Sequence, residues 1–499
     1  MGVSTSEMQD DPDTLRLGMT VGLVFMYDAI PDPPVSPAAP LASAAALRAP
    51  ADGVDRISRL PDQILRNVVS RLSAKDAACT AALASRWRSI WRSAPLAFVD
   101  AHVLPARVTA EHVVPGGEDA SSKAVVAAAS GALAKHPGPV RCFHLTRGHM
   151  ASHQAEAARC LELLAAKGVQ ELVFFNRPWP HDFPLPVAIF SCVSVTRLHL
   201  GVWRLPDTAA LPRYARFPHL REVVLSLILM GDRDLAFFVE KSPVLENLTI
   251  IASQTPVRLR LVSRSLRCVQ LGIFALAEVS VVDAPRLERL FFWMSMLHDD
   301  KSRIKIGHAP NLRMLGHWQP GNIDLEIGST VIKVLTSVSC CIAASTKVSP
   351  STIVPSVRIL ALEVEFEVCN DVKMLPGFLR CFPNVETLHA YFRGERSELM
   401  FLKFIAERAR VLKKMVVMVA VEFFSSEDDI SAKLKLLTLV KWASQDCKLI
   451  VLKNLDTEDG LPAWSFRMAS DSSCMDPFDL LTADAELRGA DVLHHSSTV

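Results

Sequence analysis

The stretch "PHLREVVLSLILMGDRDLAFFVEKSPVLENLTI", Pro218–Ile250, contains one short pattern twice and decides the fold. The spacing apolar-x-x-apolar-x-apolar begins at Leu220 and again at Leu245. A proline stands two positions before each copy, where it ends any preceding helix and favours an extended strand. Between the copies, Asp234–Lys241 is expected to form a short returning helix. A strand and a helical arm repeated at this period are typical of a repeat architecture.

The same pattern recurs along much of the chain, with starts 20 to 29 residues apart, which is the spacing of leucine-rich repeats. The copies begin at Val140, Val169, Val195, Leu220, Leu245, Leu266, Leu287, Leu312, Ile332, Val357, Val385 and Leu412. We therefore predict an irregular α/β solenoid, with parallel strands on the concave face and helices and loops on the convex face. The alternative is a generic α/β domain whose strands are similar by coincidence.

The repeat geometry also predicts a binding surface. Because side chains alternate along a strand, the pattern residues point into the core and the residues between them line the concave face. Arg289, Phe291, Trp293 and Trp318 fall on neighbouring repeats of that face. Aromatic residues and arginine dominate binding hot spots, so these four are the predicted substrate-binding residues. The alternative is that a loop or the C-terminal segment covers them.

A second informative stretch precedes the repeats: "LPDQILRNVVSRLSAKDAACTAALASRWRSIW", Leu60–Trp91. Pro61 suits the first position of a helix, since the amide it lacks would be unpaired there. Ser73 and Asp76 have the spacing of a capping box and start a second helix, and Ser85 opens a third. Units of about forty residues rarely fold alone, so part of the apolar surface is expected to bind another polypeptide.

This stretch resembles the F-box motif over Val54–Phe98. The landmarks are Leu60-Pro61-Asp62-Gln63-Ile64-Leu65, Val69-Ser70-Arg71-Leu72 and Ser85-Arg86-Trp87-Arg88. The resemblance implies that an apolar helical face binds a Skp-type adaptor, which connects it to a cullin scaffold and a RING ubiquitin ligase. The implied contact residues are Leu60, Pro61, Ile64, Leu65, Val69, Leu72, Trp87 and Trp91. Two alternatives remain: a private three-helix bundle packed against the same chain, and an F-box that binds the adaptor without forming a working ligase.

The rest of the chain resembles the plant F-box leucine-rich-repeat proteins, and "FLKFIAERARVLKKMVVMV", Phe401–Val419, resembles their FBD region. These resemblances and the composition suggest a division into domains. We expect a disordered leader at 1–52, the F-box at 53–98, a linker or N-terminal cap at 99–139, the leucine-rich-repeat domain at 140–420 with the FBD-like segment near 376–420, a C-terminal cap at 421–470 and a loosely ordered tail at 471–499.

Charge and cysteine usage limit the classes of partner. The 54 basic and 53 acidic residues nearly cancel, so no global field draws the chain to nucleic acid or to a membrane surface. The 11 cysteines show no CxxC pair and no regular spacing, as in an intracellular protein with reduced thiols. With no evident signal peptide and no uninterrupted apolar run long enough to span a membrane, we expect a protein of the cytoplasm or nucleus.

Motifs for catalysis or cofactor binding are missing from the sequence. It contains no GxGxxG, no GxxxxGK[ST], no HExxH and no GxSxG. His149, His153 and Glu156 have helical spacing for a metal, but no second shell accompanies them, so we expect no metal and no cofactor. We therefore predict a non-catalytic substrate-recognition subunit of a ubiquitin ligase of the Skp-cullin-F-box (SCF) type. The alternative is a non-degradative scaffold with an intramolecularly docked F-box.

Overall fold

The fold is described from a computed structural model of the 499-residue chain. The structure describes residues 22–35, 56–103, 120–177, 183–213, 215–253, 257–274, 276–295, 302–318, 323–327, 330–332, 354–362, 380–420, 423–453 and 466–477. The chain forms two compact units, and each is described by itself. One comprises Ile30–Val244, and the other comprises Met1–Ala29 together with Leu245–Val499.

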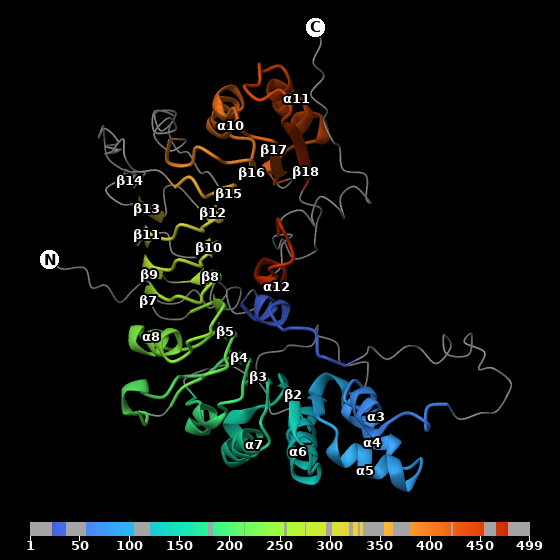
Figure 1. Cartoon of the computed structure of the whole chain (residues 1–499). Helices are drawn as coiled ribbons and strands as arrows, with labels where there is room; N and C mark the ends of the chain where they lie inside the picture. Colours follow the sequence, from blue (N-terminus) through green and yellow to red (C-terminus); the bar gives the residue numbers. More distant parts are fainter. Residues whose placement is uncertain are drawn as a thin grey trace. The chain divides into compact units, whose positions relative to one another are not determined.

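The unit of Ile30–Val244 begins with three short helices: α3 (Asp62–Val69), α4 (Ala74–Thr80) and α5 (Ser85–Ser93). A parallel sheet follows, with strands in chain order (Figure 1): β1 (Leu96–Val99), β2 (Val140–Leu145), β3 (Glu171–Phe175), β4 (Arg197–Gly201) and β5 (Glu222–Ser226). The connections and the C-terminal end contain η1 (Asp100–His102), α6 (Ala120–Lys135), η3 (Met150–His153), α7 (Gln154–Ala166), η4 (Val187–Ser191), η5 (Thr208–Ala210) and α8 (Asp232–Glu240).

The second unit contains a longer parallel sheet (Figure 1): β6 (Asn247–Ile251), β8 (Cys268–Phe274), β10 (Arg289–Ser295), β12 (Met314–Trp318), β15 (Ile359–Leu362), β16 (Thr387–Phe392), β17 (Lys414–Val419) and β18 (Lys448–Lys453). Among the described residues a further sheet has the order β14 (Thr330–Ile332), β13 (Ile323–Ile327), β11 (Ser302–His308), β9 (Leu276–Asp283) and β7 (Val257–Val262). The helices among the described residues include residues 22–28, α10 (Arg396–Arg408), α11 (Glu427–Thr438) and α12 (Phe466–Ser470).

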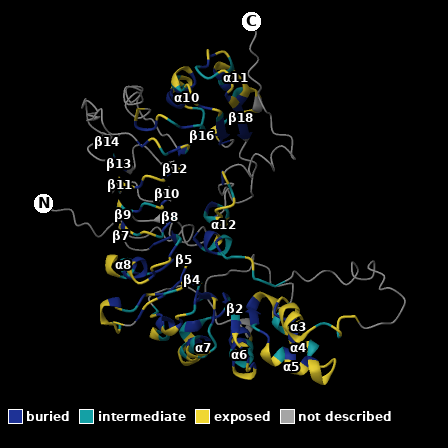
Figure 2. Ribbon diagram, in the orientation of Figure 1, coloured by how far each residue is buried: buried dark blue, intermediate teal, exposed yellow. Residues whose placement is uncertain are grey.

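The residues of the repeat pattern form the core beneath the parallel sheet of each unit, as predicted. Of the predicted copies, only the one at Ile332 falls in the further sheet that contains β7. Apart from the copy at Ile332, every pattern residue from Val140 to Val417 is buried (Figure 2). Equivalent pattern residues also pair across the strands, so that Leu172 lies beside Leu198, and Leu198 beside Val223. The leucine-rich-repeat interpretation of the spacing is therefore confirmed.

The copy predicted at Ile332 is wrong, because β12 pairs directly with β15 and no strand lies between them. Ile332 instead ends β14, which pairs antiparallel with β13 at the edge of the other sheet. That other sheet stands where helices and loops were expected. It forms because its strands alternate apolar and polar residues, as in "VRLRLV" of β7, and so bury one side. Its buried apolar residues include Leu259, Leu261, Val279, Val281, Ile304, Ile306, Leu325 and Ile327.

Parts of the predicted leader and tail are ordered, which differs from the prediction for those residues. Within the expected leader, residues 22–28 are helical, and Phe25 and Met26 are buried. They are held by α12, since the rings of Phe25 and Phe466 meet edge to face at 5.6 Å and the Phe466 amide donates to Asp28 Oδ2 at 3.1 Å. Within the expected tail, Asp476 is buried. Residues 1–21, 36–52 and 478–499 of these predictions lie outside the described residues.

The expected linker at 99–139 contains η1 and α6, while 104–119 lie outside the described residues. The expected C-terminal cap at 421–470 contributes α11, β18 and α12, and β18 continues the parallel sheet beside β17. Among the helices that the structure describes, none has the length and apolar character that a membrane span requires.

Candidate functional site

The three helices α3, α4 and α5 close a small core of their own. Its buried members are Leu65, Val69, Ala77, Trp87, Ile90 and Ala94, and the partly buried Leu60, Leu72 and Trp91 pack against them. All of them come from residues 60–94 of this chain. The three-helix unit is therefore held together chiefly by its own side chains.

Polar contacts fix the helix ends of this unit. The Arg86 guanidinium on α5 donates to Asp62 Oδ1 through Nε at 2.9 Å and through Nη2 at 2.7 Å, which ties α5 to the start of α3. It also donates to the Leu60 carbonyl at 2.6 Å. Ser73 caps α4 as predicted, because its Oγ accepts from the Asp76 amide at 3.2 Å.

The helices α3, α4 and α5 are attached to the first strands of the compact unit Ile30–Val244. The Trp91 and His136 rings lie 4.7 Å apart, and His136 Nε2 lies 3.0 Å from the Ala94 carbonyl. Directly after α5, β1 pairs with β2, and Asp100 behind it accepts from the amides of Thr146 and Arg147 at 2.6 and 2.8 Å. Burial raises the pKa of Asp100, and these hydrogen bonds oppose that effect. The helices thus have a fixed orientation toward β1 and β2.

Apolar side chains remain exposed on the three helices. Ile64 is 47% exposed and Val68, one turn further along α3, is 42% exposed. Ile57 before α3 and Leu83 after α4 are exposed as well. We call Ile57, Ile64, Val68 and Leu83 the exposed F-box face. A neighbouring polypeptide could bury these side chains, each worth about 1.5–3 kcal/mol when fully buried.

The eight predicted adaptor contacts divide into three groups. Leu65, Val69 and Trp87 are buried in the core and offer no open surface in this structure, and for them adaptor contact stays a prediction. Ile64 and Pro61 are exposed, and for them adaptor contact stays a prediction. It also stays a prediction for the partly buried Leu60, Leu72 and Trp91.

Sequence reasoning missed three members of the exposed F-box face: Ile57, Val68 and Leu83. A signal was present for Val68, because it follows Ile64 by four residues and therefore shares its side of the helix. Ile57 and Leu83 lie outside the helices α3, α4 and α5, and no helical periodicity points to them.

Two of the four predicted substrate-binding residues, Arg289 and Phe291, do not form an open surface. Arg289 is 5% exposed and Phe291 is fully buried. The C-terminal segment covers Arg289, whose Nη1 donates to the Ala469 carbonyl at 2.9 Å and to the Asp471 carbonyl at 2.7 Å. The alternative of coverage by the C-terminal segment is therefore correct for Arg289. Trp293 and Trp318 lie on β10 and β12, and their side chains lie outside the described residues.

A buried polar cluster on β2 and β3 was not predicted. Cys142, His144 and Glu171 bring one sulfur, one nitrogen and one carboxylate oxygen within 4.8 Å of one another. These atom types bind zinc, but here they satisfy each other. His144 Nε2 lies 2.7 Å from Glu171 Oε1, the Cys142 thiol donates to the same oxygen at 3.4 Å, and Arg197 donates to Oε2 at 3.4 Å. The cluster therefore has a structural explanation without an ion.

The Glu171 carboxylate is expected to stabilise the fold in a pH-dependent way. Burial alone would raise its pKa, but the hydrogen bonds from His144 and Cys142 hold it below its ordinary value of 4.5. A carboxyl with a depressed pKa stabilises the folded state above its unfolded pKa, and this contribution is lost as pH falls through the folded value. Glu171→Gln should lower the free energy of unfolding at neutral pH by about 2 kcal/mol and flatten its acid-side decline.

Urea unfolding between pH 3 and 7 measures this effect. Glu162→Gln makes the same change on the exposed side of α7 and should leave the profile unaltered. A Glu171→Gln profile that runs parallel to the parent profile would contradict the assignment.

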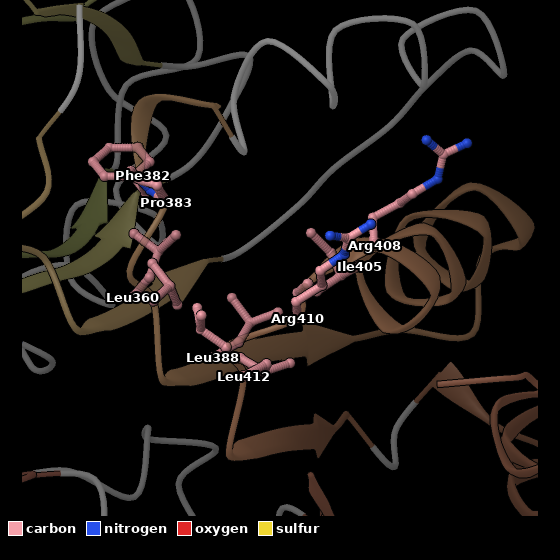
Figure 3. Close-up of a pocket in the computed structure, with 11 residues that line it drawn as sticks. Leu360, Phe382, Pro383, Leu388, Ile405, Arg408, Arg410 and Leu412 are labelled. Atoms are coloured by element: carbon pink, nitrogen blue, oxygen red, sulfur yellow. The ribbon is translucent and has the colours of Figure 1, made fainter. Parts of the chain in front are cut away.

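An apolar cavity of about 320 Å³ lies between α10, β15, β16 and the segment that connects α10 to β17. Leu360, Leu388 and Leu412 line it, and α10 ends beside it at Arg408 (Figure 3). The Arg408 guanidinium packs on the Phe404 ring at 5.6 Å. The lining has the character of a site for an apolar group, and nothing in it provides a nucleophile or an acid–base pair.

Family comparisons agree with this architecture. The F-box domain model matches residues 57–98, the model of the LRR repeats of FBD-associated F-box protein At5g56370 matches residues 157–390, and the FBD model matches residues 384–417. The chain is thus an F-box protein with leucine-rich repeats. The FBD match overlaps the segment that resembled it in sequence, which confirms that prediction.

Curated relatives have names that include these domains. FBD-associated F-box protein At4g13985 of Arabidopsis thaliana is 24% identical over 464 residues, covering 80% of this chain and 97% of the relative. F-box/FBD/LRR-repeat protein At5g22660 from the same plant is 26% identical over 387 residues, covering 69% and 78%. The chain thus matches the F-box, LRR and FBD models in this order, and the relatives it resembles are Arabidopsis F-box/FBD/LRR-repeat proteins. F-box/LRR proteins are generally non-catalytic adaptors.

Proposed function

We propose that the chain is a substrate-recognition subunit of an SCF-type ubiquitin ligase. The F-box binds a Skp-type adaptor and, through it, the cullin and RING subunits, while the repeats bind a target protein. The observation that carries the proposal is the exposed F-box face. The helices already close their own core, yet Ile64 and Val68 on α3 remain in solvent, where another polypeptide can cover them.

The proposed mechanism is proximity. A receptor that holds the adaptor at one end and the target at the other raises the effective concentration of target lysines near the ubiquitin-charged enzyme. The connection of the F-box to β1 and β2 supports this mechanism, because it fixes the orientation of the three helices relative to the first repeats. No side chain of this chain takes part in bond making. The site of action proposed is the cytoplasm or the nucleus, without nucleic-acid or membrane partners.

Co-elution with a purified Skp-type adaptor tests the proposal. The full chain and the adaptor, mixed at micromolar concentration, should elute together as a 1:1 complex in size-exclusion chromatography. With cullin and RING subunits added, the complex should transfer ubiquitin to a captured target. Separate elution of chain and adaptor at these concentrations would contradict the proposal.

The alternative is an interaction scaffold whose F-box stays docked on its own chain. The packing of Trp91 on His136 favours it, since part of the F-box is already engaged. The two functions differ in cells. Removing the chain should raise the abundance of the target if it is a ligase receptor, and should leave it unchanged if it is a scaffold.

A further inference from the structure

The C-terminal segment Phe466–Asp476 binds to a site on the parallel sheet of its own unit, where polar side chains of β8, β10 and β16 contact it. On β8, Gln270 Nε2 donates to the Phe466 carbonyl at 2.9 Å. On the same strand, Cys268 Sγ donates to the Ala469 carbonyl at 3.5 Å. From β16, His389 Nε2 lies 3.1 Å from Asp476 Oδ2. The site therefore contacts the segment from its first to its last residue.

Arg289 on β10 is the centre of this site. Its guanidinium donates to the carbonyls of Ala469 and Asp471 at 2.9 and 2.7 Å, and also to the carbonyl of Cys474. A buried arginine is costly unless its donors are satisfied. Carbonyls in the last turn of a helix have no partner within the helix, so the end of α12 supplies suitable acceptors. Arg289 thus recognises a helix end by its main chain, independent of sequence.

The ends of the segment add side-chain recognition. Phe466 is buried and packs against Phe25, while Asp476 is buried beside His389. A groove of about 560 Å³ continues beside the segment, with Ser472 and Asp476 on one side and Arg358 among its lining residues. A longer peptide than the resident segment therefore has room beyond it.

We propose that the Arg289 site is the target-recognition site and that Phe466–Asp476 occupies it in place of a target. The partner it fits is a protein with a short exposed helix that begins with an aromatic residue and is followed, about six residues after its end, by an aspartate. Target and resident segment bind the same donors and so compete. This inference rests on the proposed function, which assigns target binding to the repeats.

Peptide binding to the full chain tests the inference. The probe is a fluorescein-labelled peptide with the sequence of residues 466–477, "FRMASDSSCMDP", and the readout is fluorescence anisotropy. In the full-length double variant Phe466→Glu, Asp476→Ala, the resident segment loses both end contacts and the site should open. This variant should bind the peptide at least tenfold more tightly than the parent, in which the resident segment acts at high effective concentration.

Arg289→Ala added to the double variant should abolish peptide binding, whereas Arg260→Ala should not. Arg260 is an exposed arginine on β7, in the other sheet of the same unit, and provides a matched loss of charge. A peptide carrying Asp476→Asn should bind more weakly than the parent peptide. Equal binding by parent and double variant, or retention of binding after Arg289→Ala, would overturn the inference.

Adaptor binding in the same preparations separates this inference from the proposed function. If the double variant, in which Arg289 is intact, binds the adaptor but not the peptide, the assignment of the Arg289 site is refuted and the ligase function still stands. If the double variant binds the peptide but not the adaptor, the Arg289 site is supported and the proposed ligase function is contradicted. Matching thermal unfolding curves show that each variant is folded.

Discussion

Replacing Ile64 with aspartate is expected to abolish the complex with a Skp-type adaptor while leaving the chain folded. Ile64 lies on α3 with 47% of its surface in solvent, so an aspartate there is hydrated in the free chain. In a complex, the change removes an apolar contact worth about 1.5–3 kcal/mol and adds the cost of burying a charge. The expected loss of affinity is at least about a hundredfold, measured by titration calorimetry with the purified adaptor.

Val193→Asp is the matched control for this variant. Val193 is 48% exposed in the same unit but follows η4, outside the F-box, so the same change of residue type should leave the affinity unaltered. Val68→Asp, one helical turn from Ile64, should repeat the loss. Unchanged affinity in both Ile64→Asp and Val68→Asp would show that α3 does not face the adaptor.

Much of the fold could be predicted from the sequence because the repeat pattern and its burial have the same physical cause. A strand with apolar residues at positions one, four and six turns them to one side, and neighbouring copies such as Leu172 and Leu198 then pair in register. The three F-box helices were predictable for a similar reason, since Pro61, Ser73 and Ser85 mark local boundaries. Chain ends were less predictable. The helix at 22–28 packs on Phe466, a partner more than four hundred residues away.

The sheet formed by β7, β9, β11, β13 and β14 was not predicted by the repeat pattern. The segments "VRLRLV" of β7 and "SRIKIGH" of β11 alternate at the period of a strand, so a search for period two would have found them. The repeat template covers one strand per repeat and predicts helices and loops for the residues between its copies. The error at Ile332 has the same origin, because β14 fits the start of the template but pairs antiparallel with β13.

The sequence predicted where the candidate sites lie in the chain better than it predicted which of their side chains are exposed. Motif resemblance identifies which residues recur in an F-box, but it does not separate those that hold the helices together from those that face a partner. Leu65 and Ile64 are adjacent in the motif, yet one is fully buried and the other is half exposed. Arg289 was found through its position on the concave face, whereas its contacts with Ala469 and Asp471 depend on a segment 180 residues away.

Replacing Trp87 with alanine is expected to unfold the F-box helices, with loss of adaptor binding as a consequence. The Trp87 side chain is 8% exposed and lies in the small core with Leu65 and Val69. Removing a buried tryptophan side chain costs about 3–5 kcal/mol, which is comparable to the whole stability that such a small core provides. The measurement is hydrogen exchange of the amides of α3, α4 and α5, which should lose protection in Trp87→Ala.

The repeats should tolerate this change, because the buried members of the three-helix core all come from the F-box helices and the residue that follows them. Amides of β3 and β4 should therefore keep their protection in Trp87→Ala. Arg88→Ala, an exposed neighbour on α5, should keep both protection and adaptor binding. If Trp87→Ala instead kept the helices protected and lost only the adaptor, Trp87 would be a direct contact and the core described for the free chain would have to open on binding. Such a result would confirm the contact first inferred from the motif.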